Sequence, residues 1–503
     1  MTDLSLSCTK VGATALILAL GFACSSAIAS GEQDQRKMSP EAKSIEYDPS
    51  VFSGDPVYED KPYSSDAQVD IYGGKRALDT PRPLLELFRP IYREGPFGHS
   101  NDALGATNLL APSFNVSGDF RTAVAYNDNG AAELGQVATR LNLELDLKLT
   151  GTERIHALIR PLDQNGKFSR HEFSGDDGDS DLALNGNIET FFFEGDVGSI
   201  MGGINNKWSD LDLPFAFGKT PLLFQNGVWA EDAILGGAIA IPAKNSPALD
   251  ISNMDFTVFA GFDDVNTPAA KNADGKLNDD DLNVYGAATY IETREGYFEA
   301  GYGFVDGSGA FSDVDYHSVT AAFTRRYGGW LSNSVRGIWT FGQDGAPSGQ
   351  TADGTMLLIE NSLITSKPST YVPYFNAWIG FDRPQPLIDD SGLLKNTGIV
   401  FETDALTGFP TLDDTGHDTY GGAIGVQYLF NLDRQIVVEA ATVQTMGDDN
   451  ELGRPARADQ YGFGIRYQQP ISDQIIIRAD AMYGILQKAD NISGARIELR
   501  LKF

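Results

Sequence analysis

Residues 491–503 read NISGARIELRLKF and alternate between apolar and charged side chains. Because successive side chains of a β-strand point to opposite faces, this segment has one apolar and one charged face. The apolar face holds Ile497, Leu499, Leu501 and Phe503, and the charged face holds Arg496, Glu498, Arg500 and Lys502. Such a strand suits a wall between lipid and water. The alternative is the edge strand of a soluble sandwich with its charged face in solvent.

The same alternation recurs along the chain between breaks rich in Gly, Asp and Asn. Its clearest example is residues 140–149, RLNLELDLKL, in which every second residue is leucine. Further candidate strands begin near residues 114, 154, 188, 200, 230, 251, 282, 296, 316, 330, 355, 370, 420, 435, 461 and 475. With the C-terminal strand they give a tally of about eighteen, an even number as bacterial barrels require. The strands near Ile188 and Ile200 have the weakest patterns, so about sixteen strands is the alternative.

Hydropathy alone would describe an ordinary acidic protein, with 42% hydrophobic residues and a mean hydropathy of −0.22. No segment after Ser30 has the roughly 18 continuous apolar residues of a membrane helix. A barrel is expected to look like this, because only alternate residues of each strand face lipid. The sequence therefore predicts an all-β fold, a transmembrane antiparallel β-barrel with a short irregular N-terminal segment.

The first 29 residues are predicted to be an export signal rather than part of the fold. Lys10 supplies a weakly positive start, and residues 11–23 are small and apolar. Ala27 and Ala29 are the small residues that signal peptidase needs, which places cleavage before Ser30. The apolar run is too short to cross a bilayer of roughly 30 Å as a helix.

Both cysteines, Cys8 and Cys24, lie inside this leader. A lipoprotein with Cys24 at its new N-terminus is the alternative, but residues 21–23, Gly-Phe-Ala, lack the usual branched aliphatic residue. Removal of the leader leaves no cysteine. A disulfide scaffold, a thiolate metal site and a cysteine nucleophile are therefore excluded.

Residues 30–112 differ from the rest in being polar and rich in proline. Their one amphipathic stretch, residues 82–92 (RPLLELFRPIY), has apolar residues at helical spacing and predicts a short helix. We interpret residues 30–112 as a periplasmic or lumen-inserted segment, and residues 113–503 as the barrel. A TonB-dependent plug would normally be larger.

The connections between the expected strands fall into a short and a long class. Residues 328–329, 432–433 and 471–472 suit periplasmic turns, whereas residues 163–187, 263–281, 382–419 and 447–457 suit extracellular loops. Alternation of the two classes is typical of outer-membrane barrels. Aromatic residues near strand ends suit interfacial girdles or an ordinary core: Trp208, Trp229, Trp330 and Tyr371.

The formal net charge is −31, with the excess acid mostly in loops and in the N-terminal segment. No basic patch is available to neutralise phosphates, so nucleic-acid binding is disfavoured. The acidic loops suit solvation and mutual repulsion, or divalent-cation binding beside lipopolysaccharide. One loop resembles half of a calcium site, with Gly275 at its turn, Ala270 at the first ligand position and Asp instead of Glu at the last. Its candidate ligands are Asn272, Asp274, Asn278 and Asp281.

The face of each strand opposite the apolar one is expected to line a water-filled lumen. Four arginines of this kind lie near the start of the barrel and four near its end: Arg121, Arg140, Arg154, Arg160, Arg466, Arg478, Arg496 and Arg500. Because closure makes the first and last strands neighbours, these arginines would form one basic wall. Asp255, Glu299 and Glu360 from the middle strands would lie opposite.

Acids are interleaved with these arginines and would partly neutralise them: Glu144, Asp146, Asp480 and Glu498. A transverse field of this kind would favour small anions or carboxylates on the basic side. The alternative is that these are paired, solvated charges without a selective role.

Enzymatic interpretations have little support in the sequence. There are five histidines and no HExxH, G-x-S-x-G or P-loop pattern. His156 is expected to point into the barrel, and His317 and His417 lie near strand ends. Each is interpreted as a solvated histidine rather than a general base, so we expect no enzyme and no cofactor beyond the calcium in the surface loop.

Taken together, residues 113–503 resemble the outer-membrane porins of Gram-negative bacteria. Their size and strand tally are similar to those of eighteen-stranded substrate-specific porins and alginate-export barrels, although no motif identifies either subfamily. The resemblance implies passive diffusion of small hydrophilic solutes across the outer membrane.

The resemblance also implies contacts with outer-membrane lipid and lipopolysaccharide. The C-terminal strand resembles the segment that barrels present to their insertion machinery. A homo-oligomer remains open. Two other functions also stay open: a scaffold, receptor or sleeve whose lumen is plugged by residues 30–112 or by a partner, and a lipid-acting barrel enzyme.

Overall fold

The computed structural model describes residues 82–91, 100–164, 167–174, 179–270, 281–343, 349–402, 405–430, 434–447 and 454–503. The chain separates into residues 1–65 and 66–503, and every described residue belongs to the second unit. The expected export signal lies outside the described residues.

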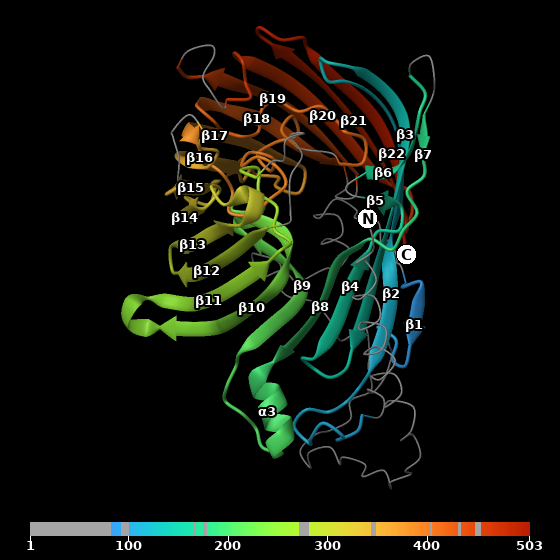
Figure 1. Ribbon diagram of the computed structural model, residues 1–503, viewed down its shortest axis with the longest axis vertical. Coiled ribbons are helices and arrows are strands. Elements are labelled where there is room, and N and C mark those ends of the chain that lie inside the picture. The colour runs from blue at the N-terminus through green and yellow to red at the C-terminus, as the bar shows by residue number, and fades with distance from the viewer. Residues whose placement is uncertain are drawn as a thin grey trace, which may run out of the picture. The chain divides into compact units, whose positions relative to one another are not determined.

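The described part of this unit forms a closed antiparallel barrel of eighteen strands, which confirms the predicted fold class (Figure 1). Each wall strand pairs with the next, and β2 pairs with β22 to close the ring. In chain order the wall strands are β2 (Ser113–Asp128), β3 (Glu133–Lys148), β4 (Arg154–Ile159), β8 (Ile188–Asp196), β9 (Pro214–Phe224), β10 (Ala230–Ser246), β11 (Ile251–Phe262), β12 (Leu282–Thr293), β13 (Gly296–Gly307), β14 (Tyr316–Tyr327), β15 (Leu331–Phe341), β16 (Asp353–Leu363), β17 (Tyr371–Arg383), β18 (Thr419–Phe430), β19 (Arg434–Thr445), β20 (Gln460–Pro470), β21 (Ile475–Leu486) and β22 (Ile492–Lys502). Closure leaves no unpaired sheet edge in the wall, as a bilayer demands.

The alternating pattern of β22 gives two faces of opposite character. Ile497 is 63% exposed on the outer surface, whereas Arg496 and Glu498 are 4% and 3% exposed on the inner one. The other strands repeat this arrangement, so large apolar side chains cover the outside of the barrel. Among the described residues, no helix has the length and hydropathy to cross a bilayer.

Most long connections lie at one rim of the barrel, called the upper rim here, as expected from the sequence; residues 197–213, between β8 and β9, form a long connection at the lower rim. Residues 160–187, 263–281 and 384–418 each join the upper ends of two wall strands, and short turns such as 294–295 and 471–474 join the lower ends. The expected turn at 432–433 lies outside the described residues. The described connections also contain three short 3₁₀ helices: η1 (Gln225–Gly227), η2 (Pro247–Leu249) and η3 (Gly309–Phe311).

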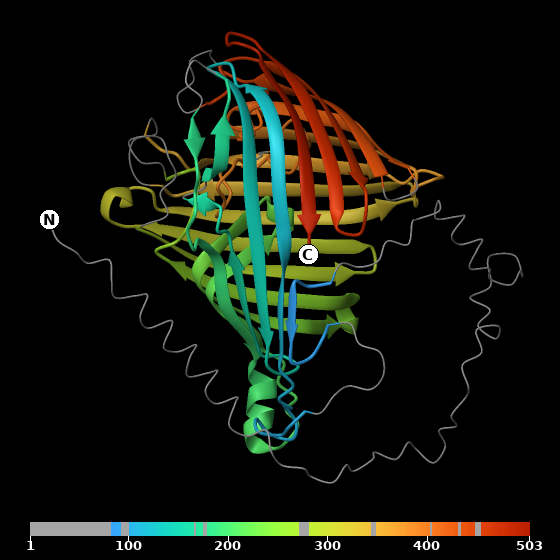
Figure 2. The same cartoon turned by 90° about the vertical axis from the view of Figure 1, so that its right-hand side faces the viewer.

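The expected strand near Ile200 is wrong, because this segment is helix α3 (Val197–Asn205) at the lower rim (Figure 2). The Asp196 carboxylate caps the helix by accepting a hydrogen bond from the Ser199 amide at 2.6 Å. The same carboxylate accepts from the Leu213 amide at 2.7 Å, which fixes the return to the wall.

The strand that the sequence did not predict is β9. Its residues, PFAFGKTPLLF, include two prolines and a glycine with φ of 123°, which are signals of a strand break. Extensive pairing with β10 outweighs these local signals. The wrongly predicted strand near Ile200 and the missed strand β9 therefore cancel in the count. The predicted number of eighteen strands is confirmed, although one of the predicted strands is wrong.

The short helix expected over residues 82–92 is also wrong. Residues Leu85–Leu87 form strand β1, which pairs with β2 in the register Leu85 to Val116 and Leu87 to Phe114 (Figure 2). The reason is that β2 extends below the end of β22, so its backbone groups there need partners. Pro90 in turn disfavours a helix over this stretch.

The hairpin of β2 and β3 is extended at its other end in the same way. The wall strand β4 pairs with β3 only up to Leu143, and β6 (Lys167–Glu172) then pairs with the upper part of β3. Two short strands, β5 (Asp163–Gln164) and β7 (Ser180–Asp181), flank β6. The β2–β3 hairpin thus pairs with short strands outside the barrel wall at both rims.

Candidate functional site in the barrel lumen

The connection between β17 and β18, residues 384–418, folds into the lumen and is called the lumen loop here (Figure 1). Its first part packs on β10, where Leu387 and Ile388 are fully buried beside Trp229. The Tyr316 hydroxyl donates to the Leu387 carbonyl at 2.9 Å. The loop is therefore anchored to the wall opposite its own strands.

The middle of the lumen loop packs on β17 to β20. Phe401 meets Trp378 edge-on, with ring centroids 5.1 Å apart, and both side chains are buried. Inward glycines on β20 make room for the loop: a Cβ at Gly462 would lie 2.9 Å from Leu412, and one at Gly464 would lie 3.1 Å from Val400. The wall is thus shaped to receive this segment.

Residues 406–407 of the lumen loop reach β2 and β3. Leu406 is buried against Ala123, Ala138 and Phe168. The side-chain amides of Asn127 and Gln136 both donate to the Thr407 carbonyl, at 2.7 and 2.6 Å. The loop therefore crosses the lumen from β10 to the β2–β3 hairpin.

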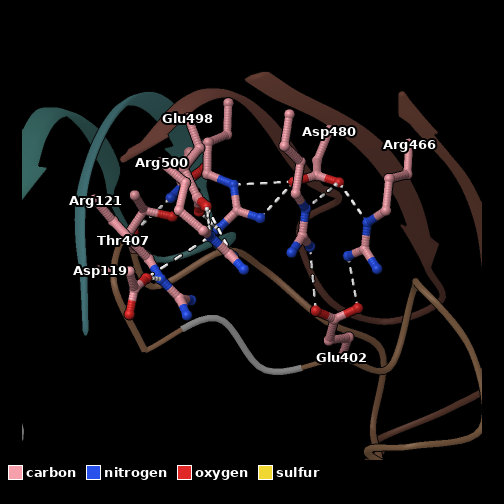
Figure 3. Close-up of polar contacts among 11 residues, drawn as sticks. Asp119, Arg121, Glu402, Thr407, Arg466, Asp480, Glu498 and Arg500 are labelled. Atoms are coloured by element: carbon pink, nitrogen blue, oxygen red, sulfur yellow. Dashed lines mark hydrogen bonds and ion pairs between the residues drawn. The ribbon is translucent and has the colours of Figure 1, made fainter. Parts of the chain in front are cut away.

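Six of the predicted arginines form a continuous group on β3, β2, β22, β21 and β20, which we call the arginine wall: Arg121, Arg140, Arg466, Arg478, Arg496 and Arg500. Figure 3 labels three of them, Arg121, Arg466 and Arg500. Arg140 lies opposite Arg121 on the neighbouring strand, and Arg121 lies opposite Arg500 across the closure of the barrel. Like charges in direct register repel. Such a row needs water or counter-charges around it.

Asp480 is the main counter-charge of the arginine wall, and its side chain is only 1% exposed (Figure 3). It accepts hydrogen bonds from the Nε atoms of Arg466 at 2.7 Å, Arg478 at 2.9 Å and Arg496 at 3.0 Å. Charge-assisted hydrogen bonds of this kind hold guanidinium groups in fixed orientations.

Two further acids of the barrel balance the wall near the closure. Glu498 accepts from Arg500 Nη2 at 3.0 Å. Asp119 pairs with Arg121 and lies 3.8 Å from Arg500 Nε. Arg140, by contrast, lies 5.2 Å from the Phe168 ring centroid and donates from Nε to Asn142 at 3.0 Å.

One acid comes from the lumen loop rather than from the barrel. Glu402 Oε2 lies 2.6 Å from Arg466 Nη2, and its Oε1 lies 3.1 Å from Arg478 Nη2 (Figure 3). Burial acts to raise the pKa of Glu402, but Arg466 and Arg478 outweigh it and the pKa lies below its usual value. Glu402 is therefore an anion bound between two arginines.

The other predicted lining residues lie away from this group. Arg154 pairs with Asp146 at 2.7 Å and Glu194 at 3.4 Å. Arg160 pairs with Glu189 at 2.8 Å.

Asp255 and Glu299 line one cavity of about 80 Å³ on the opposite wall, together with Trp229. Glu360 is also on that side and pairs with the buried Arg336 at 3.1 Å. The structure thus places acids opposite the arginine wall.

Three of the four candidate calcium ligands, Asn272, Asp274 and Asn278, lie outside the described residues. The fourth, Asp281, accepts a backbone hydrogen bond from Ser308 at 2.8 Å. The described residues contain no group of three or more metal-ligating side chains.

Trp229 and His317 have surroundings that the sequence did not predict. Trp229 is fully buried in the lumen, where its indole donates to Ser318 Oγ at 3.0 Å, so it is not a girdle residue. His317 points to the outer face and stacks on Phe304 and Phe341.

Sequence reasoning missed Glu402 and the lumen loop that carries it. Alternation places residues of strands, but it says nothing about the path of a long loop. The signal that could have revealed the contact is the inward pair Gly462 and Gly464, which leaves a shallow place on the wall two residues before Arg466.

Known proteins resemble this chain in architecture but not in sequence. No protein-family model matches the chain, and no curated protein matches its sequence. Among solved structures, Pseudomonas aeruginosa OpdK, solved with vanillate, has a TM-score of 0.53 at 12% identity, covering 77% of this chain and 98% of that one. OccK11 (OpdR) from the same organism has a TM-score of 0.52 at 9% identity, covering 78% and 96%. Acinetobacter baumannii OccAB4 has a TM-score of 0.50 at 11% identity, covering 78% and 98%.

These neighbours are substrate-specific outer-membrane porins, which are channels and not enzymes. The likeness establishes the fold. This chain therefore has the fold of an integral outer-membrane porin, an eighteen-stranded barrel with an apolar outer surface.

Proposed function

We propose that the protein is an outer-membrane channel through which small hydrophilic solutes diffuse passively, with a preference for anions. The observation that supports this most strongly is the row Arg140, Arg121 and Arg500, which crosses the closure of the barrel on three adjacent strands. Positive groups along one side of a water-filled lumen attract small anions and lower their barrier to entry.

The lumen loop narrows the path and directs solutes along the arginine wall. It is packed against β10, β17 to β20 and the β2–β3 hairpin, so it occupies much of the interior. Asp480 and Glu498 hold the arginines in place and keep each anion-binding step weak enough for release. No energy input is required, because binding along the wall is reversible and solutes move down their own gradient.

Planar-bilayer recording of the purified full chain tests this function. We expect stable ohmic steps and, in a salt gradient, a reversal potential on the anion side. Liposome-swelling rates for sugars, amino acids and carboxylates would then rank the solutes. A silent barrel, or a channel without anion preference, would contradict the proposal.

The second candidate is a closed barrel that acts as a scaffold or receptor. The three buried contacts of the lumen loop favour it, because they could plug the lumen completely. Phe401→Ala distinguishes the two functions, since it removes the edge-on contact with Trp378. In a plugged scaffold the wild type is silent and this variant opens, whereas in a channel the wild type already conducts. Phe381→Ala, which removes an outward ring 49% exposed, is the matched control.

A further inference from the structure

Glu402 lies in the place that an anionic solute would take on the arginine wall. Its two carboxylate oxygens are shared between Arg466 and Arg478, at 2.6 and 3.1 Å. The same two arginines turn their Nε atoms toward Asp480, at 2.7 and 2.9 Å. Asp480 therefore orients the pair, and the outer nitrogens form a clamp that Glu402 fills.

The Glu402 side chain is partly exposed although its carboxylate is bound. Its side chain is 37% exposed, compared with 1% for Asp480. Arg466 and Arg478 are 18% and 14% exposed. The side chains of the clamp are therefore partly exposed, whereas Asp480 is buried.

The backbone that carries Glu402 is fixed just before this residue. The Val400 amide donates to Glu439 Oε1 at 3.0 Å, and the Val400 carbonyl accepts from the Leu412 amide at 2.8 Å. Phe401 is fully buried. A movement of the Glu402 side chain out of the clamp would therefore leave these contacts of Val400 and Phe401 in place.

We propose that Glu402 is a tethered counterion of the Arg466–Arg478 clamp, and that a solute carboxylate passes this point by exchanging with it. The inference rests on the proposed channel function and adds a specificity-determining residue to it. The incoming carboxylate makes the same charge-assisted hydrogen bonds that Glu402 gives up, so the exchange has a small net free energy.

Such an exchange explains how the clamp can bind an anion and still release it. With Asp480 as their shared counter-charge and no Glu402, the two arginines would keep a net positive charge, hold an anion tightly and slow its release, and conduction requires weak binding. A tethered competitor is present at an effective concentration in the millimolar range. Solutes below that concentration bind only transiently.

The other acidic side chains near the clamp are held in other contacts, so Glu402 is the one that we assign to this exchange. Asp480 is buried and holds three arginine Nε atoms. Glu439 is 2% exposed and is held by the Tyr374 hydroxyl and the Val400 amide. Glu498 pairs with Arg500, farther along the wall.

The experiment compares Glu402→Gln with wild type in chloride-carrying bilayers, using propionate as the probe because it reproduces the end of a glutamate side chain. Without the tethered carboxylate, the concentration of propionate that halves the chloride current should fall about threefold to tenfold. Propionamide, the neutral analogue, should have no effect on either protein. Glu402→Asp, whose shorter side chain spans the two arginines poorly, should give an intermediate value.

Glu360→Gln is the matched control, because it removes one lumen carboxylate that pairs with Arg336 away from the clamp. A half-inhibiting concentration for Glu402→Gln equal to that of this control would overturn the inference and leave the channel function intact. A wild-type barrel without current would contradict the channel function itself, and the inference with it. Heat-modifiable migration on gels confirms that each variant is folded.

Discussion

Gly118 and Phe503 exchange two backbone hydrogen bonds, with N–O distances of 2.7 and 3.0 Å. They mark the point on β2 at which the last strand of the wall ends. Below this point β2 continues for several residues, and the pairing is taken over by β1. The closure of the barrel is therefore made by two segments from opposite ends of the sequence.

Loss of β1 should weaken the barrel at this closure. Leu87→Pro removes an amide donor and disfavours the paired conformation, and pairing over three residues is worth about 1–3 kcal/mol. We expect the free energy of unfolding in urea to fall by this amount. Leu184→Pro, at a residue 73% exposed and outside the strands, is the control. Equal effects of the two prolines would show that β1 adds nothing to stability.

The outer face of β22 should reject a charge in a way that the inner face does not. Ile497→Arg places a cation among acyl chains and should cost about 2–4 kcal/mol near the bilayer midplane. Folding into liposomes, followed by heat-modifiable migration, measures the effect. Ser117→Arg, which faces the lumen on β2, should fold normally. If both variants insert equally well, Ile497 does not face lipid.

The alternation of apolar and charged residues that supports this prediction could be identified in the sequence at each position. The outward and inward positions of β22 follow directly from NISGARIELRLKF, and the neighbourhood of Arg121 and Arg500 follows from closure. Both depend only on the two-residue period of a strand and on the ring, so no distant contact has to be known.

The parts that the sequence did not predict depend on distant contacts. The strand β1 forms because β2 extends beyond the end of β22. The position of Glu402 depends on the packing of Val400 against two glycines of β20. The short apolar stretch around Ile200 was interpreted as a strand, but it forms helix α3, which Asp196 caps. In each case the local sequence pattern either gave no signal or indicated the wrong structure.

The arginines should contribute unequally to selectivity. Within the described residues, no carboxylate lies within ion-pair distance of Arg140, whereas Arg154 pairs with Asp146 and Glu194. A charge in water acts on another at 4 Å with about 1 kcal/mol, or about fivefold in occupancy. We expect Arg140→Ala to lower the anion-to-cation permeability ratio by about this factor, and Arg154→Ala to change it little. Reversal potentials in a salt gradient give both ratios.

The combined replacement of Arg140, Arg478 and Arg500 by alanine should shift the reversal potential further toward cations. Each change removes one positive charge from the same side of the lumen, so the shifts should accumulate. An unchanged reversal potential would remove the arginine wall from the mechanism of transport.

Docking of the lumen loop should weaken as pH rises. Burial, and then the neighbouring Asp413, raise the pKa of Asp414 to about 7, although Lys395 lowers it in part. An exposed aspartate has a pKa of about 3.9, so the docked loop binds this proton more tightly than an undocked loop. Docking is therefore strongest below about pH 4 and is weakened as pH rises through about 7.

Single-channel recordings test this dependence. Current fluctuations should increase from about pH 5 to about pH 8 in the wild type, and Asp414→Asn, which is neutral throughout, should keep them low. Fluctuations that stay constant over this range in the wild type would show that Asp414 does not control docking.

The position of Arg121 and Arg500 on the first and last strands of the wall has a consequence for biogenesis. A half-built sheet keeps Arg121 and Arg500 apart, because they become neighbours only when β22 pairs with β2. If the proposed function holds, the charge row is completed in the same step that seals the wall. A chain that stalls before its final strand would then lack both the sealed wall and the complete row.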